Sequence, residues 1–250
     1  MKNFKKQFKS FVDKYLNNYN FVYLTTDLRG FIKTFPDIHP DEICDFIINT
    51  FIKKKITVII PTYSYSNKGK FIIESTQSNL SYFTKWFLTK KIERSEHPIF
   101  SVASRGPKSK IVMNIGKSAF GYDSIFERLL KNKTSIFHLG RPFNYGNTIT
   151  HYIEQSVGAS YRHNKNISTS VYKKKKLIGK NYSIFARNSN LKDKKYITNS
   201  KKIDLILKKK KLITQIGNEK KLTNITHLDF KKIYHVMCNS FYNDNKIFIN

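Results

Sequence analysis

Hydrophobic and polar positions follow a helical period near the start of the chain. Between residues 4 and 16, apolar side chains recur every three or four positions, and lysines occupy the positions between them. This pattern predicts an amphipathic helix that packs on the body of the protein, although a basic helix lying on a membrane surface has the same pattern. Similar periods predict helices over residues 40–54, which begin with Pro40 and two acids, and over residues 80–89.

Short apolar runs between these helices predict buried strands. They cover residues 21–24, which lead into a polar turn ending at Gly30, residues 56–60 before Pro61, and the segments "TSIFHLG" and "NYSIFAR". Helices that alternate with such strands are typical of an α/β fold, and we expect a central mixed sheet flanked by helices. Beyond about Lys165, lysine runs separate strand-like pieces. We expect one compact unit over residues 1–250, with a motif-dense part at 20–165 and a completing part at 166–250.

The charge of the chain is strongly positive. Lys and Arg number 46 against 17 Asp and Glu, a formal net charge of +29, and such a field attracts anions. The chain is also rich in Asn, Ile, Phe and Tyr, so a coding bias explains the lysines equally well. No zinc-finger spacing, aromatic RNA-binding strand or recognition helix is recognisable, and we expect no nucleic-acid partner. A weak contact with a membrane surface and a homodimer both remain open.

Cysteine usage and hydropathy indicate the compartment. Cys44 and Cys238 form neither a metal-ligand spacing nor a disulfide framework, which fits a reducing environment. No apolar run reaches the length of a membrane span, and the lysine-rich N-terminus lacks the apolar centre of a secretory signal. We therefore expect a cytoplasmic protein with no metal site.

The segment "GNTITHYIEQ", residues 146–155, contains the most specific chemistry. It is predicted as a loop that enters a helix, and helical spacing then puts His151 and Glu154 on one face, one turn apart. The carboxylate would hold the imidazole in one tautomer and strengthen it as a base. A histidine that only fills space near a helix N-terminus is the alternative. Glycine-rich phosphate loops, HExxH and G-x-S-x-G are not found in the sequence.

Polar turns follow several of the predicted strands, and ligand sites gather at strand ends in α/β sheets. In their order and spacing, these turns resemble the aminoglycoside N3-acetyltransferase family, an acetyl-CoA-dependent group distinct from the GNAT fold. Six segments within residues 20–165 carry the resemblance: "VYLTTDLRGF", "TVIIPTYSYS", "RSEHPIFSVASRGP", "AFGYDSIFERLL", "FHLGRPFNYGNTITHYIEQ" and "SYRHNK".

The resemblance implies a mechanism. In the family, the histidine of Asn-Thr-x-x-His is the general base, and the matching residue here is His151. An amine is mostly protonated at neutral pH and needs a base before it attacks the thioester of acetyl-CoA directly, so no protein nucleophile is required. Glu154 would orient or electrostatically support the imidazole.

Further roles are implied for the other turns. Thr25 and Thr26 would face the pantetheine or pyrophosphate of acetyl-CoA, with Arg29 adding charge. Ser101 and Ser124 match hydroxyl positions in the family's cleft. The substrate side of the site would include four residues from the matched motifs: Tyr63, His97, Asn147 and Thr148. Structural alternatives exist for the matched hydroxyl residues, since Thr25 and Thr26 suit a turn and Ser124 suits a helix N-cap.

Two departures from the family concern the acceptor. Many members that modify aminoglycosides have His-Pro-x-His-Ser, but Phe100 occupies the position of the second histidine here. The segment after Pro-Thr-Tyr, "SYSNKGKF", is basic, whereas a polycationic antibiotic favours carboxylates. We therefore expect an amino sugar linked to a nucleotide or lipid phosphate as the acceptor, with an aminoglycoside as the alternative. An inactive relative that acts as a basic binding protein is the alternative from another class.

Overall fold

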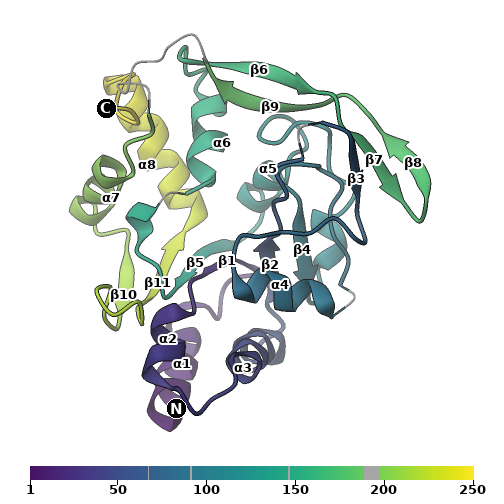
Figure 1. Cartoon of the computed structure of the whole chain (residues 1–250). Helices are drawn as coiled ribbons and strands as arrows, with labels where there is room; N and C mark the ends of the chain where they lie inside the picture. Colours follow the sequence, from purple (N-terminus) through teal and green to yellow (C-terminus); the bar gives the residue numbers. More distant parts are fainter. Residues whose placement is uncertain (67, 91, 146, 189–196) are drawn as a thin grey trace.

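The computed structural model describes residues 1–66, 68–90, 92–145, 147–188 and 197–250 (Figure 1). Its helices are α1 (Lys2–Tyr15), α2 (Arg29–Thr34), α3 (Pro40–Lys53), α4 (Tyr82–Thr89), α5 (Ile125–Leu130), α6 (Ile149–Ser156), α7 (Ser200–Lys209) and α8 (Phe230–Asn243). Its strands are β1 (Phe21–Thr26), β2 (Thr57–Pro61), β3 (Lys70–Ile72), β4 (Val102–Arg105), β5 (Thr134–Leu139), β6 (Arg162–Ile167), β7 (Ser170–Lys173), β8 (Lys176–Gly179), β9 (Tyr182–Arg187), β10 (Thr214–Ile216) and β11 (Ile225–Asp229).

A six-stranded sheet with the order β10-β11-β5-β1-β2-β4 forms the centre of the molecule. Strands β5, β1 and β2 are parallel, whereas β4, β11 and β10 join antiparallel to their neighbours. The expected α/β fold with a mixed central sheet is therefore confirmed. Because β1 lies between two parallel neighbours, its carboxyl end at Thr25 and Thr26 opens beside the carboxyl ends of β5 and β2. This is the edge at which α/β sheets bind ligands.

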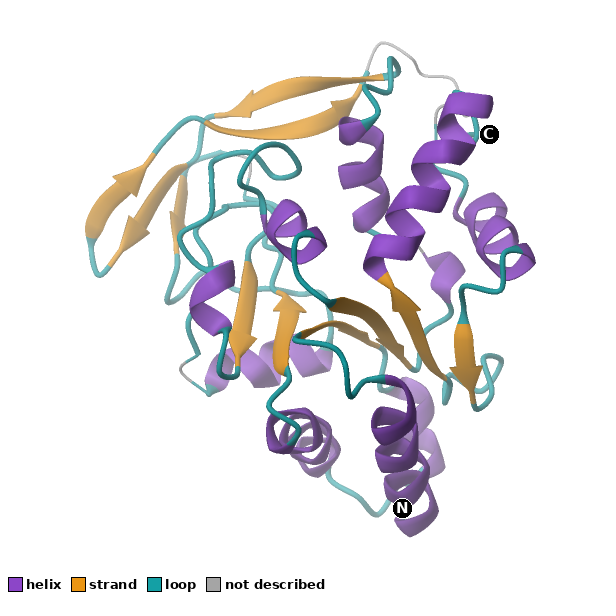
Figure 2. Cartoon of the chain, turned by 180° about the vertical axis from the view of Figure 1, so that it is seen from behind, coloured by secondary structure: helices purple, strands orange, loops and turns teal. Residues whose placement is uncertain are grey.

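Helices cover both faces of this sheet (Figure 2). Alternate residues of β1 point to opposite faces: Phe21 and Tyr23 pack in the cluster that includes α5, α6 and α8, and Val22 and Leu24 in the one that includes α1, α3 and α4. The ring of Phe137 meets three other phenylalanine rings at centroid distances of 5.4–6.0 Å.

The first helix packs on the body of the protein, as its helical pattern of apolar residues with lysines between them predicted. The apolar residues of α1 are buried: Phe4, Phe8, Phe11 and Val12. A membrane-surface role for this apolar face is therefore ruled out, because the side chains that would enter a bilayer already form part of the core. Among the described residues, no helix has both the length and the apolar character needed to cross a membrane.

The polar turn predicted after the first strand is shorter than expected, because a helix already includes its predicted last residue, Gly30. Helix α2 begins at Arg29, and Gly30 in its first turn approaches the chain near the C-terminal strands. A Cβ at Gly30 would lie 2.1 Å from the carbonyl oxygen of Lys221. The glycine at which the predicted turn ended therefore permits a close approach of two backbone segments.

Two smaller sheets extend from the central one. Strands β3, β7 and β8 form one, and β6 pairs antiparallel with β9 in the other. In Figure 1, β6 and β9 run from the end of α6 across to β7 and β8. A separate small core, which includes Phe71, Val171 and Tyr182, attaches this extension to the rest. The lysine-rich C-terminal part also supplies β10, β11 and α8, so it completes the central sheet as expected.

Candidate active site

A cavity of about 630 Å³ opens at the carboxyl ends of β1 and β2. Its walls come from the ends of these strands, the loop after β2, the start of α4, the segment between β5 and α6, helix α6 itself, the β6–β9 pair and the start of α7. Five of the predicted site residues that line it are Thr25, Thr26, Tyr63, Asn147 and Thr148, and His151 joins them from α6. The structure thus brings most of the predicted residues together in one place.

His151 and Glu154 form a pair, as the helical spacing predicted. His151 Nδ1 lies 2.8 Å from Glu154 Oε2. The Glu154 side chain is fully buried, and that of His151 remains 29% exposed, within the cavity wall. A carboxylate only accepts hydrogen bonds, so Nδ1 donates and carries the proton. The other ring nitrogen, Nε2, is then left as an acceptor.

Glu154 has two further partners, both supplied by the residues that follow α6. Arg162 Nε lies 2.7 Å from Glu154 Oε2, and the Tyr161 hydroxyl donates to Oε1 at 3.2 Å. Burial, followed by the nearby carboxylate, raises the pKa of Tyr161, so this phenol stays a donor. The buried carboxylate is therefore neutralised by one guanidinium, and it stays in position behind His151.

Arg162 is a site residue to which no role was assigned from the sequence. Its guanidinium also donates to the Phe185 carbonyl at 3.3 Å and to the Thr198 hydroxyl at 3.2 Å. It therefore ties the support of His151 to the β6–β9 pair and to the segment before α7. The segment "SYRHNK" was part of the resemblance, which is the only signal in the sequence that could have singled it out.

A buried histidine supports the opposite wall. His138 on β5 bonds Thr25 Oγ1 through Nδ1 at 2.5 Å, and Asn147 Nδ2 donates to its Nε2 at 3.0 Å. Burial, with a smaller contribution from Arg141, holds the pKa of His138 well below its usual value. The ring is therefore neutral, with its proton on the nitrogen that faces Thr25, and it sets the positions of two cavity residues from behind.

Two tyrosines meet beside the cavity. The hydroxyls of Tyr23 and Tyr63 lie 2.5 Å apart, and the Tyr63 hydroxyl also forms a hydrogen bond with the side chain of Thr148. Burial raises the pKa of Tyr63 to about 12. Both phenols therefore remain protonated at neutral pH, and Tyr63 presents a fixed hydroxyl at the wall.

A second cavity of about 430 Å³ adjoins the first. Both are lined by Thr26, Ser81 and Arg141, so they form one cleft. Thr26 Oγ1 lies 3.3 Å from Ser81 Oγ, and Ser81 caps α4. Arg29 lines the second cavity, where its 76% exposed side chain pairs with Asp27.

The structure places three predicted residues away from this cleft. The hydroxyl of Ser101 is fully buried, donates to the Thr62 carbonyl at 2.9 Å and accepts from Arg94 Nε at 3.0 Å. Burial lowers the pKa of Arg94 to about 10, and this guanidinium joins the β2 and β4 segments. A cleft position for Ser101 is therefore corrected to a structural one.

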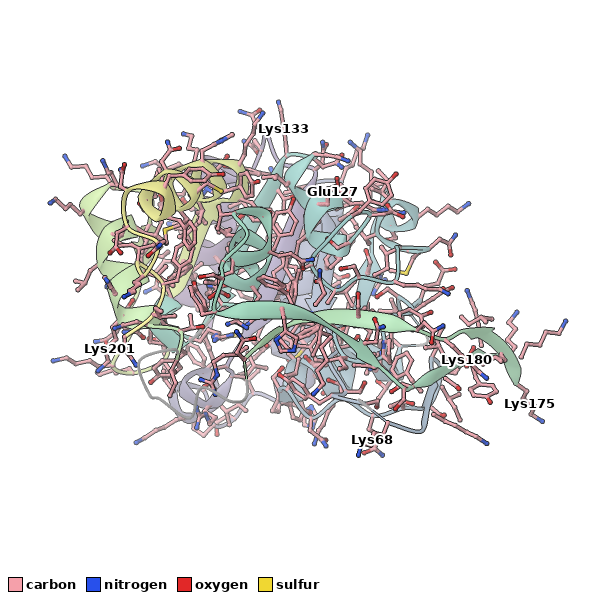
Figure 3. All side chains as sticks on the ribbon, turned by 90° about the horizontal axis from the view of Figure 1, so that it is seen from above. Lys68, Glu127, Lys133, Lys175, Lys180 and Lys201 are labelled. Atoms are coloured by element: carbon pink, nitrogen blue, oxygen red, sulfur yellow. The ribbon has the colours of Figure 1, made fainter. Side chains whose placement is uncertain are left out.

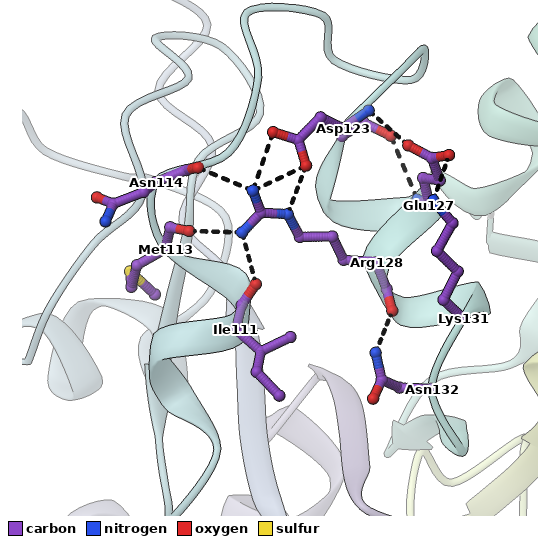
Figure 4. Close-up of polar contacts among 9 residues, drawn as sticks. Ile111, Met113, Asn114, Asp123, Glu127, Arg128, Lys131 and Asn132 are labelled. Carbon is purple, nitrogen blue, oxygen red and sulfur yellow. Dashed lines mark hydrogen bonds and ion pairs between the residues drawn. The ribbon is translucent and has the colours of Figure 1, made fainter.

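Ser124 is the N-cap of α5, which was its structural alternative. Its buried hydroxyl accepts from the backbone N–H of Glu127, and the Glu127 carboxylate accepts in return from the N–H of Asp123 at 2.5 Å. Figure 4 shows Arg128 beside this cap, where it pairs with Asp123 and donates to three carbonyls of residues 111–114. These bonds hold the loop before α5, and Ser124 does not line the cleft.

His97 is also structural. Its Nδ1 accepts from the N–H groups of Ile99 and Phe100 at 3.2 and 3.1 Å, so its Nε2 carries the proton and faces the Ser183 carbonyl. Burial lowers the pKa of His97 to about 4. The residue has no exposed surface and does not line the cavity, so its predicted place on the substrate side is corrected.

The cleft is basic. Arg141, Arg162 and Arg187 line the main cavity, and Arg187 is the direct partner of Arg162 in the β6–β9 register. Among the described residues that line this cavity, none is an aspartate or glutamate. Within the described ranges, no cluster of three or more His, Cys, Asp or Glu side chains forms a potential metal site.

One comparison with known proteins identifies a family. The model of the family described as aminoglycoside 3-N-acetyltransferase matches residues 51–232. A search of curated proteins finds no match.

Several solved structures share the fold. The apoenzyme of the aminoglycoside acetyltransferase AAC(3)-IVa has a TM-score of 0.72 and 15% identity, covering 98% of this chain and 91% of its own. AAC-VIa bound to sisomicin has a TM-score of 0.74 and 14% identity, with coverages of 96% and 97%. The YokD protein from Bacillus subtilis has a TM-score of 0.70 and 13% identity, with coverages of 96% and 94%.

Proposed function

Because the chain belongs to the aminoglycoside 3-N-acetyltransferase family, whose members use acetyl-CoA, we propose that His151 is the general base for transfer of an acetyl group to the amine of an anionic amino sugar. The observation that carries this proposal is the contact of 2.8 Å between His151 and the buried Glu154, at the wall of the main cavity. Acetyl-CoA supplies the activated acetyl group as a thioester.

The protein's part in the reaction is to prepare the amine. Glu154 holds the proton of His151 on Nδ1, so Nε2 can accept a proton from the ammonium or from the amine as it attacks the carbonyl carbon. The new N–C bond forms as the C–S bond breaks, CoA leaves as its thiolate, and the imidazolium formed at His151 gives its proton to that thiolate. Such general-base help contributes roughly a hundred- to ten-thousandfold in rate.

The cleft suits acetyl-CoA in shape and chemistry. The second cavity extends the main one past Thr26 and Ser81, which offers an elongated pantetheine a continuous groove. Hydroxyls at Thr25 and Thr26 supply hydrogen bonds, and Arg29 and Arg141 supply positive charge for phosphates. We assign these residues to acetyl-CoA. The co-substrate is abundant in the cytoplasm, where we place the reaction.

The charge of the main cavity supports an anionic acceptor. Arg162 is neutralised by Glu154, whereas Arg187 also lines the main cavity, and the described residues that line this cavity include no carboxylate. A ligand with several amino groups would meet these cations without a matching carboxylate, which is costly. An amino sugar linked to a nucleotide or lipid phosphate brings one amine for His151 and negative charge for the arginines. Tyr63, Asn147 and Thr148 would orient the sugar.

Aminoglycoside acetylation is the second candidate, because AAC-VIa has been solved with sisomicin bound and shares this fold. The two candidates predict opposite results in one experiment. Purified protein is incubated with saturating acetyl-CoA and one of several acceptors: amino-sugar nucleotides, amino-sugar phosphates, sisomicin or gentamicin. Mass spectrometry detects the acetylated product, and the His151→Ala variant serves as the control.

We expect acetylation of a phosphate-bearing amino sugar, with an efficiency that falls as the salt concentration rises. Because acetyl-CoA is saturating, its own phosphates do not contribute to this salt effect. Turnover of sisomicin or gentamicin alone would favour the antibiotic. If no acceptor is acetylated and calorimetry detects no binding of acetyl-CoA, the inactive-relative alternative is favoured.

A further inference from the structure

The outer face of the small β3-β7-β8 sheet has an apolar row across its three strands. Ile72 on β3 pairs with Tyr172 on β7, and Tyr172 pairs with Leu177 on β8. The inner face is occupied by Phe71 and Val171, which are fully buried in the small core. Ile72 is 39% exposed and Leu177 is 49% exposed, so the outer row is partly open to solvent.

Lysines surround this row. Residues 162–187 contain eight Lys and Arg and no acid, and five of the eight residues 173–180 are lysine. Lys70 lies over the ring of Tyr172, with its ammonium 5.7 Å from the ring centre. Figure 3 shows Lys175, Lys180 and Lys68 extending into solvent from this end of the molecule. The face thus combines an apolar centre with a cationic margin.

The turn between β7 and β8 is formed by two lysines in an unfavourable backbone conformation. Lys174 and Lys175 have φ angles of +48° and +65°, which is the left-handed region at both central positions of a two-residue hairpin. Asn-Gly is the pair that suits such a turn. Glu74 secures it by accepting from the Lys174 N–H at 3.0 Å. The two lysines therefore bring positive charge to the tip of the hairpin, and they do so in a strained backbone conformation.

We propose that this face, defined by Ile72, Tyr172 and Leu177 with the tip lysines Lys174 and Lys175, docks on the surface of an anionic phospholipid bilayer. Lysines gain from the negative surface potential of such a bilayer, and the exposed Ile and Leu gain from the boundary between headgroups and acyl chains.

A bilayer fits this face better than a nucleic acid does. A polynucleotide offers phosphates to the lysines but no apolar phase to Ile72 and Leu177, and the one aromatic ring in the row lies beneath Lys70. The docking face shares no residue with the lining of the main cavity, so the cavity remains open when the face is occupied. This inference does not depend on which acceptor is acetylated.

Vesicle flotation of the full-length protein tests the proposal. The probes are vesicles of phosphatidylcholine alone and vesicles that also contain phosphatidylglycerol. We expect binding only to the anionic vesicles, and weaker binding at high salt. The variant Lys174→Asn/Lys175→Gly gives the turn its preferred residues and removes two charges, so it is expected to fold at least as well. Each lysine near an anionic surface raises partitioning about fivefold, so this variant should bind about 30-fold more weakly.

A matched control removes two lysines elsewhere. Lys210 and Lys211 are exposed and directly follow α7, a helix that lies across the molecule from β7 and β8 in Figure 1, and Lys211 also has a positive φ of +55°. Lys210→Asn/Lys211→Gly should bind vesicles almost as well as the wild type. Leu177→Ser should weaken binding by about tenfold and leave its salt dependence unchanged, because it removes only apolar insertion.

Three results would overturn the proposal. One is equal binding to neutral and anionic vesicles, and another is an equal loss in the two double-lysine variants, which would indicate an effect of net charge alone. The third is hairpin-dependent binding of transfer RNA together with hairpin-independent binding of vesicles. The rate of acetyl transfer to a water-soluble acceptor should be the same in all three variants.

Discussion

Replacement of Glu154 by glutamine tests the catalytic pair without changing the volume of a buried side chain. In the wild type, one carboxylate holds the Nδ1 proton of His151 and neutralises Arg162. The glutamine amide carries no charge, and its NH₂ group can donate to Nδ1. Donation to Nδ1 moves the ring proton to Nε2, which can then no longer accept from an amine.

The loss in rate can be worked from the geometry. A unit charge about 4 Å away is worth about 4 kcal/mol at the effective dielectric constant of a protein near its surface, which is a factor of about a thousand in stabilising the imidazolium. His151 is partly exposed, so we expect kcat with saturating acetyl-CoA to fall by about two to three orders of magnitude.

The variant should also be less stable, because Arg162 keeps its charge in a site with 8% side-chain exposure. Removing one partner of a buried pair costs about 3–5 kcal/mol in the free energy of unfolding. Replacing Arg162 by methionine in the same chain should recover much of this stability but none of the rate. A variant that regains stability without regaining the rate shows that Glu154 supports the base and does not serve packing alone.

Release of free CoA thiol gives kcat, and urea unfolding gives the free energy. Glu127→Gln is the matched control, because Glu127 also pairs with a cation and accepts from a backbone N–H, but at the surface of α5. Its rate should be unchanged. A folded Glu154→Gln protein with a kcat within about threefold of the wild type would refute the role given to the carboxylate.

Three further predictions follow from the same contacts. His151→Ala should retain acetyl-CoA affinity, measured by calorimetry, and lose at least about a hundredfold in kcat; near-normal turnover would remove it as the base. His97→Asn should reduce the loss of stability between pH 6.5 and 4. The folded pKa of His97, about 4, lies below the unfolded value, so the unfolded chain takes up a proton first and about 3 kcal/mol of unfolding free energy is lost as the pH falls through this window. Urea titrations that show the same decline in both proteins would contradict this. Phe137→Ala should cost about 3–5 kcal/mol in unfolding free energy, because the ring is fully buried among three others; a loss under 1 kcal/mol would show that the neighbouring rings close the space.

Periodic parts of the fold were predictable because each depends on a local pattern. The buried strands β1, β2 and β5 are continuous apolar runs, and the spacing of His151 and Glu154 follows from helical geometry alone. By contrast, helix α2 is short, and its glycine is explained only by distant backbone at Lys221. The contact that determines its conformation involves residues far away along the chain, so no local pattern indicates it.

The polar residues of the site divide in the same way. Ser101 and Ser124 match the family's motif, but each has a nearer partner, Arg94 and the N–H of Glu127, that takes its hydroxyl out of the cleft. Arg162 reaches the carboxylate only because the chain turns back after α6, and Arg187 lies beside it only through the pairing of β6 with β9. Such neighbours arise from tertiary structure, which residue spacing does not encode.

The strand order has a consequence for synthesis on the ribosome. Helix α1 is synthesised well before the ring that it packs against, because Phe137 belongs to β5, far along the chain from α1. The other edge of β5 is covered only by β11, which precedes the final helix. The apolar face of α1 therefore stays uncovered until β5 has been made, and topology of this kind folds slowly. This face waits for a partner far along the chain, so it is a place where protection during synthesis matters.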